Sequence, residues 1–543
     1  MPTIALPANN FVNPFQIWSS VIDFLDQNSL CNLAQCNKNL RDISEAKLYA
    51  NVHLVPEPVL KTGQWFIDTN ETYVFGYRSM IKSNDQNDIY LYDKIERLIE
   101  SKKLSKVKKI VIGKKLFSDA ASGHAVLKRL LNGLLPLKKA HTIEIQDEYL
   151  FNAYYGSILK VSQSLCTLRL KSLADLGHVH SSCTTLQIDS AFGSETGTII
   201  QTFDQIETLV LSNFDALSIL QFLQSKGIVL KNVKNLTLYH QHDSNTKPWH
   251  IESLLKVIPL EKLKTLEIGF SCEVDECECS QTFFSTLGPL LLNLSELSLI
   301  EKSIETPTHH NSKEKWDIDV NHFIIELPEF GAHLKKLSIM HNIPANGQIA
   351  DSVDGNYFRR RRMYEQMLPH LINLEVLIAP TFIQSLSCFE VLSCDFLWNG
   401  CRCPFCQKVL AVMDKYIHNH VFFNDWFADF KDIGPINLVA YASSFLSNRL
   451  ISKDHNQLKV FGEAPLDVHW DFHGFDSIGH YKGYTCFFDE SAFKPLAVCF
   501  QHFTDTYMEY IVHFLPKLKF CCLSGIYYYI EDHAFHSVYD NAV

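Results

Sequence analysis

The sequence has no long hydrophobic run. No window of its 543 residues approaches the ~20 consecutive apolar residues that a membrane-spanning helix needs. The first residues, Met1 to Pro7, also lack the basic region and apolar core of a signal peptide. We therefore expect no membrane partner and a location in the cytoplasm, the nucleus or both. The sixteen cysteines are then expected as reduced thiols or metal ligands, because these compartments keep thiols reduced.

Positive charge is also scarce. Lys and Arg number 49 against 60 Asp and Glu, which gives a net charge of -11 and argues against a nucleic-acid partner. The one basic run, Arg359 to Arg362, has two interpretations. It is a nuclear address or anion site, or it is a solvated helix face or loop, which is the more frequent meaning of such a run.

Familiar catalytic motifs are absent as well. The sequence contains no phosphate-binding loop, nucleophile elbow or zinc-protease helix. The best candidates for a hydrolytic metal centre are the acidic and histidine side chains Asp467, His469, Asp471, His473, Asp476 and His480. Histidines in aromatic-rich segments are more often packed and hydrogen-bonded. We therefore expect a protein that is not an enzyme, with a metal-dependent hydrolase as the least favoured alternative.

What the sequence does contain begins with two amphipathic segments near the N-terminus. Apolar residues recur at helical spacing from Ile17 to Leu25 and again from Leu30 to Leu40. Asn28 or Ser29 can cap the second helix. So small a module cannot bury all of its apolar surface alone, which implies a partner. The alternative is an ordinary helical hairpin that caps a larger domain.

These residues resemble the F-box family over roughly positions 11 to 54. The segment from Pro14 to Leu25 is similar to the first helix of the family, and the segment from Ser29 to Arg41 is similar to its second and third. The chain departs from the family at Asn13 and Gln16. The resemblance implies that a Skp-type adaptor binds the following residues: Pro14, Ile17, Trp18, Val21, Leu25, Leu30, Leu33, Asn37 and Leu40.

From residue 107 a second regularity begins, in which apolar residues recur with the spacing apolar-x-x-apolar-x-apolar. Its instances start at Val107, Ala140, Leu165, Cys183, Ile206, Val233, Leu263, Leu294, Leu334, Leu374 and Leu515. Each predicts a short half-buried strand, and spans such as 216–224 and 249–258 supply helices between them. The array resembles irregular leucine-rich repeats, which implies a curved solenoid. An open α/β sheet is the alternative, although it needs longer strands.

Alternate side chains of a strand point to opposite faces, so the variable position between the last two apolar residues should line one surface. The candidate target-binding residues on it are Glu144, Arg169, Gln187, Thr237, Glu267, Ser298 and Ser338. With Arg169 as the one arginine in this row, we do not expect phosphate-dependent recognition.

Two segments are rich in cysteine. Cys403-x-x-Cys406 has the spacing of a zinc knuckle, and a structural zinc ion is predicted with ligands drawn from Cys394, Cys401, Cys403, Cys406 and His418. Packed, reduced core cysteines are the alternative. The acidic segment from Cys272 to Cys279 is interpreted as a floppy polar loop, because surrounding carboxylates raise thiol pKa values.

The predicted fold class is α/β: an N-terminal helical F-box (1–54), linking strands and a helix (55–106), a leucine-rich-repeat solenoid (107–385), a Cys-rich helical insertion (386–455) and a C-terminal aromatic region with the last repeat and cap (456–543). The resemblance implies a fungal-type substrate receptor of an SCF (Skp-cullin-F-box) ubiquitin ligase. Its partners would be the adaptor, through it cullin, and a protein target. A non-ligase scaffold or assembly subunit that binds the same adaptor is the alternative.

Overall fold

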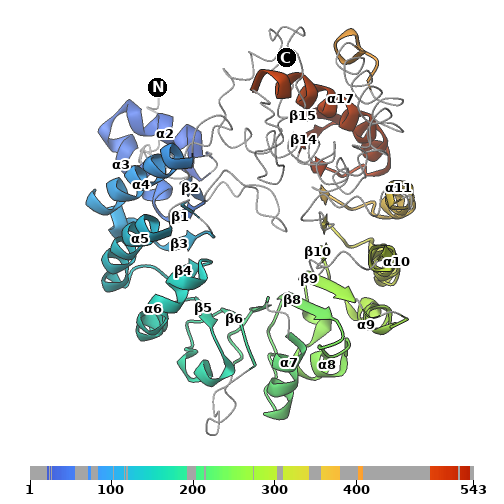
Figure 1. Ribbon diagram of the computed structural model, residues 1–543, viewed down its shortest axis with the longest axis horizontal. Helices are drawn as coiled ribbons and strands as arrows, with labels where there is room; N and C mark the ends of the chain where they lie inside the picture. The colour runs from blue at the N-terminus through green and yellow to red at the C-terminus, as the bar shows by residue number, and fades with distance from the viewer. Residues whose placement is uncertain are drawn as a thin grey trace, which may run out of the picture. The chain divides into compact units, whose positions relative to one another are not determined.

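The computed structural model (Figure 1) describes residues 21–55 except 24 and 26, 71–74, 84–117 except 102 and 115, 120–191, 203–212, 216–301 except 273 and 275, 310–340, 356–379, 401–407, 490–523 and 526–537. Contacts divide the chain into two compact units. Unit 1 comprises residues 1–57, 67–78 and 82–166, and unit 2 comprises residues 58–66, 79–81 and 167–543. None of the helices in the described ranges is both long and apolar enough to cross a membrane.

Unit 1 begins with helices and continues with parallel strands. Its elements are α2 (Gln27–Cys36), α3 (Lys38–Leu48), β1 (Asn51–Leu54), β2 (Thr72–Val74), α4 (Asn84–Glu100), η1 (Lys103–Lys106), β3 (Lys109–Ile112), α5 (Ala120–Leu134), η2 (Leu135–Leu137), β4 (Thr142–Ile145), α6 (Glu148–Val161) and η3 (Ser162–Ser164). The strands lie in the order β2-β1-β3-β4, and each neighbouring pair is parallel. Helices α4, α5 and α6 lie along one side of these strands (Figure 1).

Unit 2 repeats the alternation of a parallel strand with a helix or 3-10 turn. It contains β5 (Thr167–Leu170), η4 (Leu173–His178), β6 (Thr185–Ile188), β7 (Thr208–Leu211), α7 (Ala216–Ser225), β8 (Asn235–His242), α8 (Glu252–Val257), η5 (Leu260–Lys262), β9 (Thr265–Cys272), α9 (Cys279–Leu287), η6 (Gly288–Leu290), β10 (Glu296–Glu301), α10 (His310–Ile325), η7 (Pro328–Gly331), β11 (Lys336–Met340), α11 (Asn356–Met367), η9 (Leu368–His370), β12 (Val376–Ala379), α17 (Glu490–Phe514), β13 (Phe520–Leu523), β14 (Ile526–Glu531) and β15 (Ala534–Ser537).

The strands of unit 2 follow one another in chain order from β5 to β15. They are parallel as far as β13, and β14 and β15 close the series as an antiparallel hairpin. Within the described strands of unit 2 this order has no reversal, unlike the open α/β sheet that was the alternative. The protein is therefore a mixed α/β protein with a large parallel sheet, as the coarse fold class predicted.

The repeated apolar pattern forms the core because of strand alternation. In β7, Leu209 and Leu211 are fully buried, whereas Val210 between them is only partly covered. In most instances, the backbone amide of the first apolar residue donates a hydrogen bond to the carbonyl three residues earlier and so closes a turn before the strand. Leu374, for example, donates to Leu371. Apolar burial of this kind supplies ~25 cal/mol per Å², so the sheet is stabilised mainly along this face.

The last instance of the pattern was placed three residues too early. Leu377 of β12 pairs with Cys521 of β13, so the strand core is Cys521 and Leu523 rather than Leu518 and Phe520. Leu518 instead closes the turn before the strand, with its amide donating to the Leu515 carbonyl. Both registers satisfy the apolar spacing, since buried Cys521 behaves as a small apolar residue, and strand pairing selects the later one.

Strands β8 and β9 are twice as long as the four-residue strands β3 to β7. Their pairing continues for four further residues beyond Leu238 and Ile268, up to His242 beside Cys272. The extension buries polar side chains as well as apolar ones, among them His240 and Ser271. Something other than the apolar pattern therefore determines how far these two strands run.

Candidate functional site

The predicted adaptor surface lies in the N-terminal helical module, which we define as residues 21–54. Its core is made by Ile22, Leu30 and Leu48, with partly buried apolar side chains packed around them: Leu25, Leu33, Ile43 and Tyr49. Leu30 is only 1% exposed, so it holds the module together and does not offer a contact surface. That part of the predicted set is corrected, because helix α2 turns Leu30 inward toward Ile22.

Other predicted adaptor residues are more accessible. The side chain of Val21 is 40% exposed, and those of Leu25, Leu33 and Leu40 are partly exposed. Asn37 is exposed, and its side chain has a local role described below. Pro14, Ile17 and Trp18 lie outside the described residues. The adaptor-binding set therefore stays a prediction, with Leu30 moved to the core.

Asn37 starts helix α3. Its backbone is extended, and its side-chain oxygen accepts a hydrogen bond of 2.9 Å from the Leu40 amide. This satisfies one of the amides that every helix leaves free at its N-terminus. Asn37→Ala is expected to destabilise the module by about 1 kcal/mol. Amide hydrogen exchange in α3 would measure this. The matched control Asn39→Ala, inside the same helix, is expected to be neutral or slightly stabilising, and equal protection in both variants would contradict the capping role.

Polar contacts fasten the module to the strands of unit 1. The Gln27 side chain donates to the Tyr73 carbonyl and accepts from the Tyr73 amide, at 3.0 and 2.9 Å. Glu45 accepts from Lys103 and Lys106 at 3.0 and 3.1 Å. Burial alone would raise the pKa of Glu45, but its hydrogen bonds to the two ammonium groups lower it. The side chains of the module thus join it to strand β2 and to η1.

A second set of polar contacts joins β1 and β3 through Glu71. His53 is fully buried, and its Nε2 lies 2.7 Å from Glu71, which also pairs with Lys109 of β3. Burial alone would raise the pKa of Glu71, but the hydrogen bonds and positive charges of His53 and Lys109 lower it to about 2. The carboxylate therefore stays charged inside unit 1.

The predicted target-binding row is in register. Within unit 2, neighbouring strands pair the row residues directly, as in Arg169 with Gln187 and Thr237 with Glu267. In unit 1, Glu144 pairs with Val111 and accepts from Gln146 at 2.6 Å. Ser298 and Ser338 are only 2% and 0% exposed. Their side chains are therefore not accessible to a partner in this structure.

The accessible part of the row in unit 2 is held by side-chain hydrogen bonds. Arg169 pairs with Asp189 at 2.7 Å, and Gln187 donates to the same carboxylate at 3.0 Å. Glu267 accepts a hydrogen bond of 2.6 Å from Tyr239. Burial, then the charge of Glu267, raises the pKa of Tyr239 well above its ordinary range, so the phenol stays a donor. These side chains form an ordered polar surface.

The Cys-rich segment lies close to a histidine that is distant in the sequence. The sulfurs of Cys401, Cys403 and Cys406 and a ring nitrogen of His502 all lie within 4.8 Å of one another. His502 Nδ1 is 3.7 Å from the sulfur of Cys403 and 3.1 Å from that of Cys406. Burial raises the pKa of Cys401 to about 11. The arrangement offers a metal ion one imidazole and three sulfurs, which is a common structural zinc set.

This ligand set corrects the predicted one in part. His502 of α17 was not predicted, because 95 residues separate it from Cys406 and no local spacing joins them. Cys394 and His418 lie outside the described residues. The same holds for the hydrolase candidates: Asp467, His469, Asp471, His473, Asp476 and His480. The basic run lies in helix α11, and Arg362, its one member whose side chain the structure describes, is exposed.

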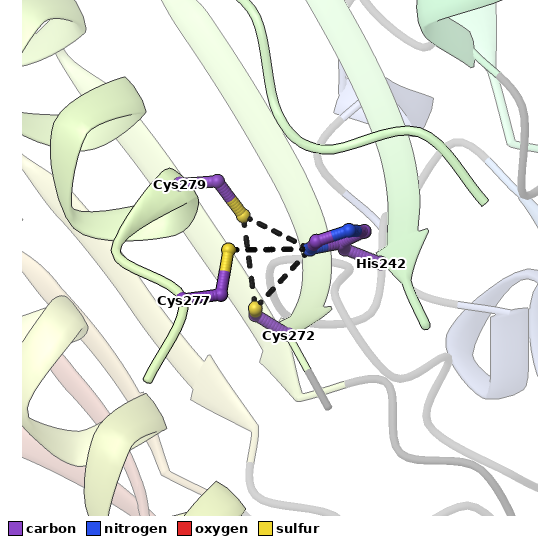
Figure 2. Close-up of side chains that lie close together, drawn as sticks. All are labelled: His242, Cys272, Cys277 and Cys279. Atoms are coloured by element: carbon purple, nitrogen blue, oxygen red, sulfur yellow. Dashed lines mark hydrogen bonds between the residues drawn. The ribbon is translucent and has the colours of Figure 1, made fainter. Parts of the chain in front are cut away.

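A second cluster was missed. Figure 2 shows His242, Cys272, Cys277 and Cys279 pointing toward one another. His242 Nδ1 lies 3.4, 3.6 and 3.2 Å from the sulfurs of Cys272, Cys277 and Cys279, and the sulfurs of Cys272 and Cys279 are 3.6 Å apart. The interpretation of this segment as a floppy polar loop is wrong, because strand pairing delivers His242 to it from β8.

Charge and hydrogen bonding favour a thiolate in this cluster. The hydrogen bond from Cys279, followed by those from His242 and the Val274 backbone, lowers the pKa of Cys272 to about 4 despite burial. Lys315 of α10 adds its positive charge at 3.4 Å from the same sulfur. The matching hydrogen bond raises the pKa of Cys279. The hydrogen bond between the two sulfurs therefore favours the thiolate at Cys272 and the thiol at Cys279.

Comparison with known proteins gives the class. No protein-family model matches the chain. A relative nevertheless shows that the chain belongs to the F-box protein family. This relative is the non-SCF-type F-box protein ROY1 of Saccharomyces cerevisiae, 37% identical over 97% of this chain and 99% of its own length.

The comparison confirms the F-box resemblance and corrects two expectations. A substrate receptor of an SCF ligase and a cullin partner were predicted from the general properties of the family. A relative that spans nearly the whole chain is a non-SCF-type protein, so both predictions are wrong. Both predictions rested on the resemblance of the N-terminal helices to the F-box family, and that resemblance does not distinguish members that act with a cullin from members that do not.

Proposed function

We propose that the protein is an F-box scaffold or assembly subunit that binds a Skp-type adaptor and acts outside ubiquitin ligases. The observation that carries this is the 37% identity, over 97% of the chain, to a protein described as non-SCF-type. Its action is binding rather than catalysis. Skp-type adaptors are intracellular, so the site of action is the cytoplasm, the nucleus or both.

The N-terminal helical module is the proposed adaptor site. Its support is the apolar surface around Val21, Leu25, Leu33 and Leu40, which the core of three side chains leaves accessible. A small module with such a surface gains stability when a partner covers it. Binding would therefore cover the same residues that the F-box resemblance selects.

The repeats of unit 2 are proposed to be leucine-rich repeats that hold a protein target. Support comes from the sequential parallel strands and from the polar surface of Arg169, Gln187, Thr237 and Glu267. Hydrogen bonds to Asp189 and Tyr239 hold the side chains of Arg169, Gln187 and Glu267 in place before a target binds. Pre-ordered side chains lose less entropy on binding.

Zinc is proposed as the ion of the Cys401, Cys403, Cys406 and His502 cluster. Three sulfurs and one imidazole satisfy the tetrahedral preference of zinc without an open position. The ion would tie the short 401–407 segment to helix α17 and take no part in catalysis.

Adaptor binding is tested by Val21→Asp, because a carboxylate in an apolar interface must lose its hydration. We expect adaptor recovered with the purified chain to fall at least about tenfold, the equivalent of ~1.4 kcal/mol. The matched control is Leu137→Asp, which changes an apolar side chain of nearly equal exposure, 39% against 40%, outside the module. Equal adaptor recovery by both variants would contradict the proposal. Leu30→Asp is unsuitable, because it would unfold the module.

The non-ligase role is tested in the same native purification. Adaptor without stoichiometric cullin is the expected result, with a conventional SCF receptor purified in parallel to show that cullin survives the procedure. Cullin recovered in equal amounts from both preparations would overturn the proposal.

A further inference from the structure

We propose that His242, Cys272, Cys277 and Cys279 form a second structural zinc site, which clamps the extended ends of β8 and β9 to the start of helix α9. This site is separate from the module and from the Cys401 cluster. Its four ligand atoms all lie within 4.8 Å of one another, and they come from three elements and one loop (Figure 2).

The distances match a tetrahedron around one ion. With Zn–S of about 2.3 Å and Zn–N of about 2.0–2.1 Å, the edges between ligand atoms are roughly 3.5–3.8 Å. The three distances from His242 Nδ1 to the sulfurs and the distance between the Cys272 and Cys279 sulfurs run from 3.2 to 3.6 Å, and all ligand atoms lie within 4.8 Å of one another. An ion of this size therefore needs only a small outward movement of the sulfurs.

A network of hydrogen bonds explains the same atoms less well. A neutral imidazole nitrogen carries either one proton or one lone pair, so His242 Nδ1 can make one such bond. Three sulfurs surround it at 3.6 Å or less. A shared cation at the centre accounts for all three approaches at once.

The surroundings fit the charge of a zinc site. Zinc with three thiolates and a neutral imidazole carries a net charge of about -1. Lys315 lies 3.4 Å from the Cys272 sulfur and donates to the Cys277 carbonyl. Its ammonium group supplies the compensating charge at the edge of the site, as groups around metal ligands commonly do.

The backbone also places the four ligand residues next to one another. His242 and Cys272 are paired at the ends of β8 and β9. Glu276 has φ of 57°, a left-handed conformation that a non-glycine residue adopts only where its surroundings enforce it. The turn returns Cys277 and Cys279 to the strand ends. The clamp accounts for why these two strands run twice as far as β3 to β7.

The test measures metal in the full chain, purified under reducing conditions from zinc-containing medium. His242→Ala and Cys277→Ser are each expected to lose about one zinc relative to wild type, irrespective of the ion held by the other cluster. Glu278→Gln, an exposed carboxylate in the same loop, is the matched control and should keep it. Unchanged zinc in both ligand variants would overturn the proposal.

Wild-type protein provides a second measurement that does not depend on how variants fold. Alkylation of Cys277 and Cys279, mapped by mass spectrometry, should be slow with zinc and fast after chelation. Chelation should also increase hydrogen exchange in residues 239–242 and 269–272 more than in β6. Cobalt added to the stripped chain should give the visible spectrum of tetrahedral sulfur ligation. Labelling and exchange unaffected by chelation, or a Cys272–Cys279 disulfide in the native chain, would refute the site.

Discussion

The double substitution Cys403→Ser and Cys406→Ser should remove about one zinc per chain and accelerate tryptic cleavage after the exposed Arg402. Two of four ligands are lost, and hydroxyls replace thiolates poorly. Structural zinc contributes on the order of 10 kcal/mol of apparent binding energy in small domains, so the loss should be large. Elemental analysis and timed proteolysis would measure it.

The control for this experiment is Cys31→Ser with Cys36→Ser, which changes two exposed thiols of α2 outside either cluster. It should leave the zinc content unchanged. Adaptor binding should survive the Cys403 and Cys406 substitutions, because the module belongs to unit 1 and these cysteines to unit 2. Zinc content equal to wild type in the Cys403 and Cys406 variant would leave these cysteines as packing residues.

The second large effect concerns Glu71. Its pKa is about 2 in the folded chain against an ordinary 4.5, so folding is favoured by the charged form. The stabilisation is complete above about pH 5 and is lost as the pH falls through 4.5 toward 2. The shift corresponds to about 3 kcal/mol at most. Hydrogen exchange in β1 and β3 should therefore accelerate on acidification.

Glu71→Gln should remove most of this acid dependence and weaken β1 and β3 at pH 7 by a similar amount, because buried His53 and Lys109 lose their counter-charge. Asp93→Asn is the control, since it breaks an exposed pair with Arg97 that is worth at most about 0.5 kcal/mol. A wild-type acid profile retained by the Glu71 variant would show that another group causes it.

The features that could be predicted from the sequence are those that depend on residues close to one another along the chain. Strands β3 to β12 follow from local apolar spacing, since burial of alternate side chains requires the same pattern wherever it occurs. The extra length of β8 and β9 could not be predicted, because polar and small residues interrupt the apolar pattern in their added segments. His240 and Ser271 are buried there for reasons that a hydrophobic pattern does not contain.

The ligand sets escaped prediction for a different reason. Spacing rules recognise Cys403 and Cys406, but His502 and His242 come from elements far along the chain from their cysteines. Only strand pairing and helix packing bring them close. The pairing of His242 with Cys272 could be deduced once β8 and β9 are aligned, so a correct register is the missing signal.

The chain-order pairing of strands has a consequence for how this protein tolerates insertions. The connection from Ala379 to Phe520 is about fourfold longer than that from Met340 to Val376, yet each joins neighbouring parallel strands. For a flexible chain, loop closure costs only ~0.6 kcal/mol for each doubling of length, so a fourfold difference in length by itself is worth about 1.2 kcal/mol. Segments can thus be gained or lost between neighbouring strands at little thermodynamic cost while the pairing of the sheet is kept.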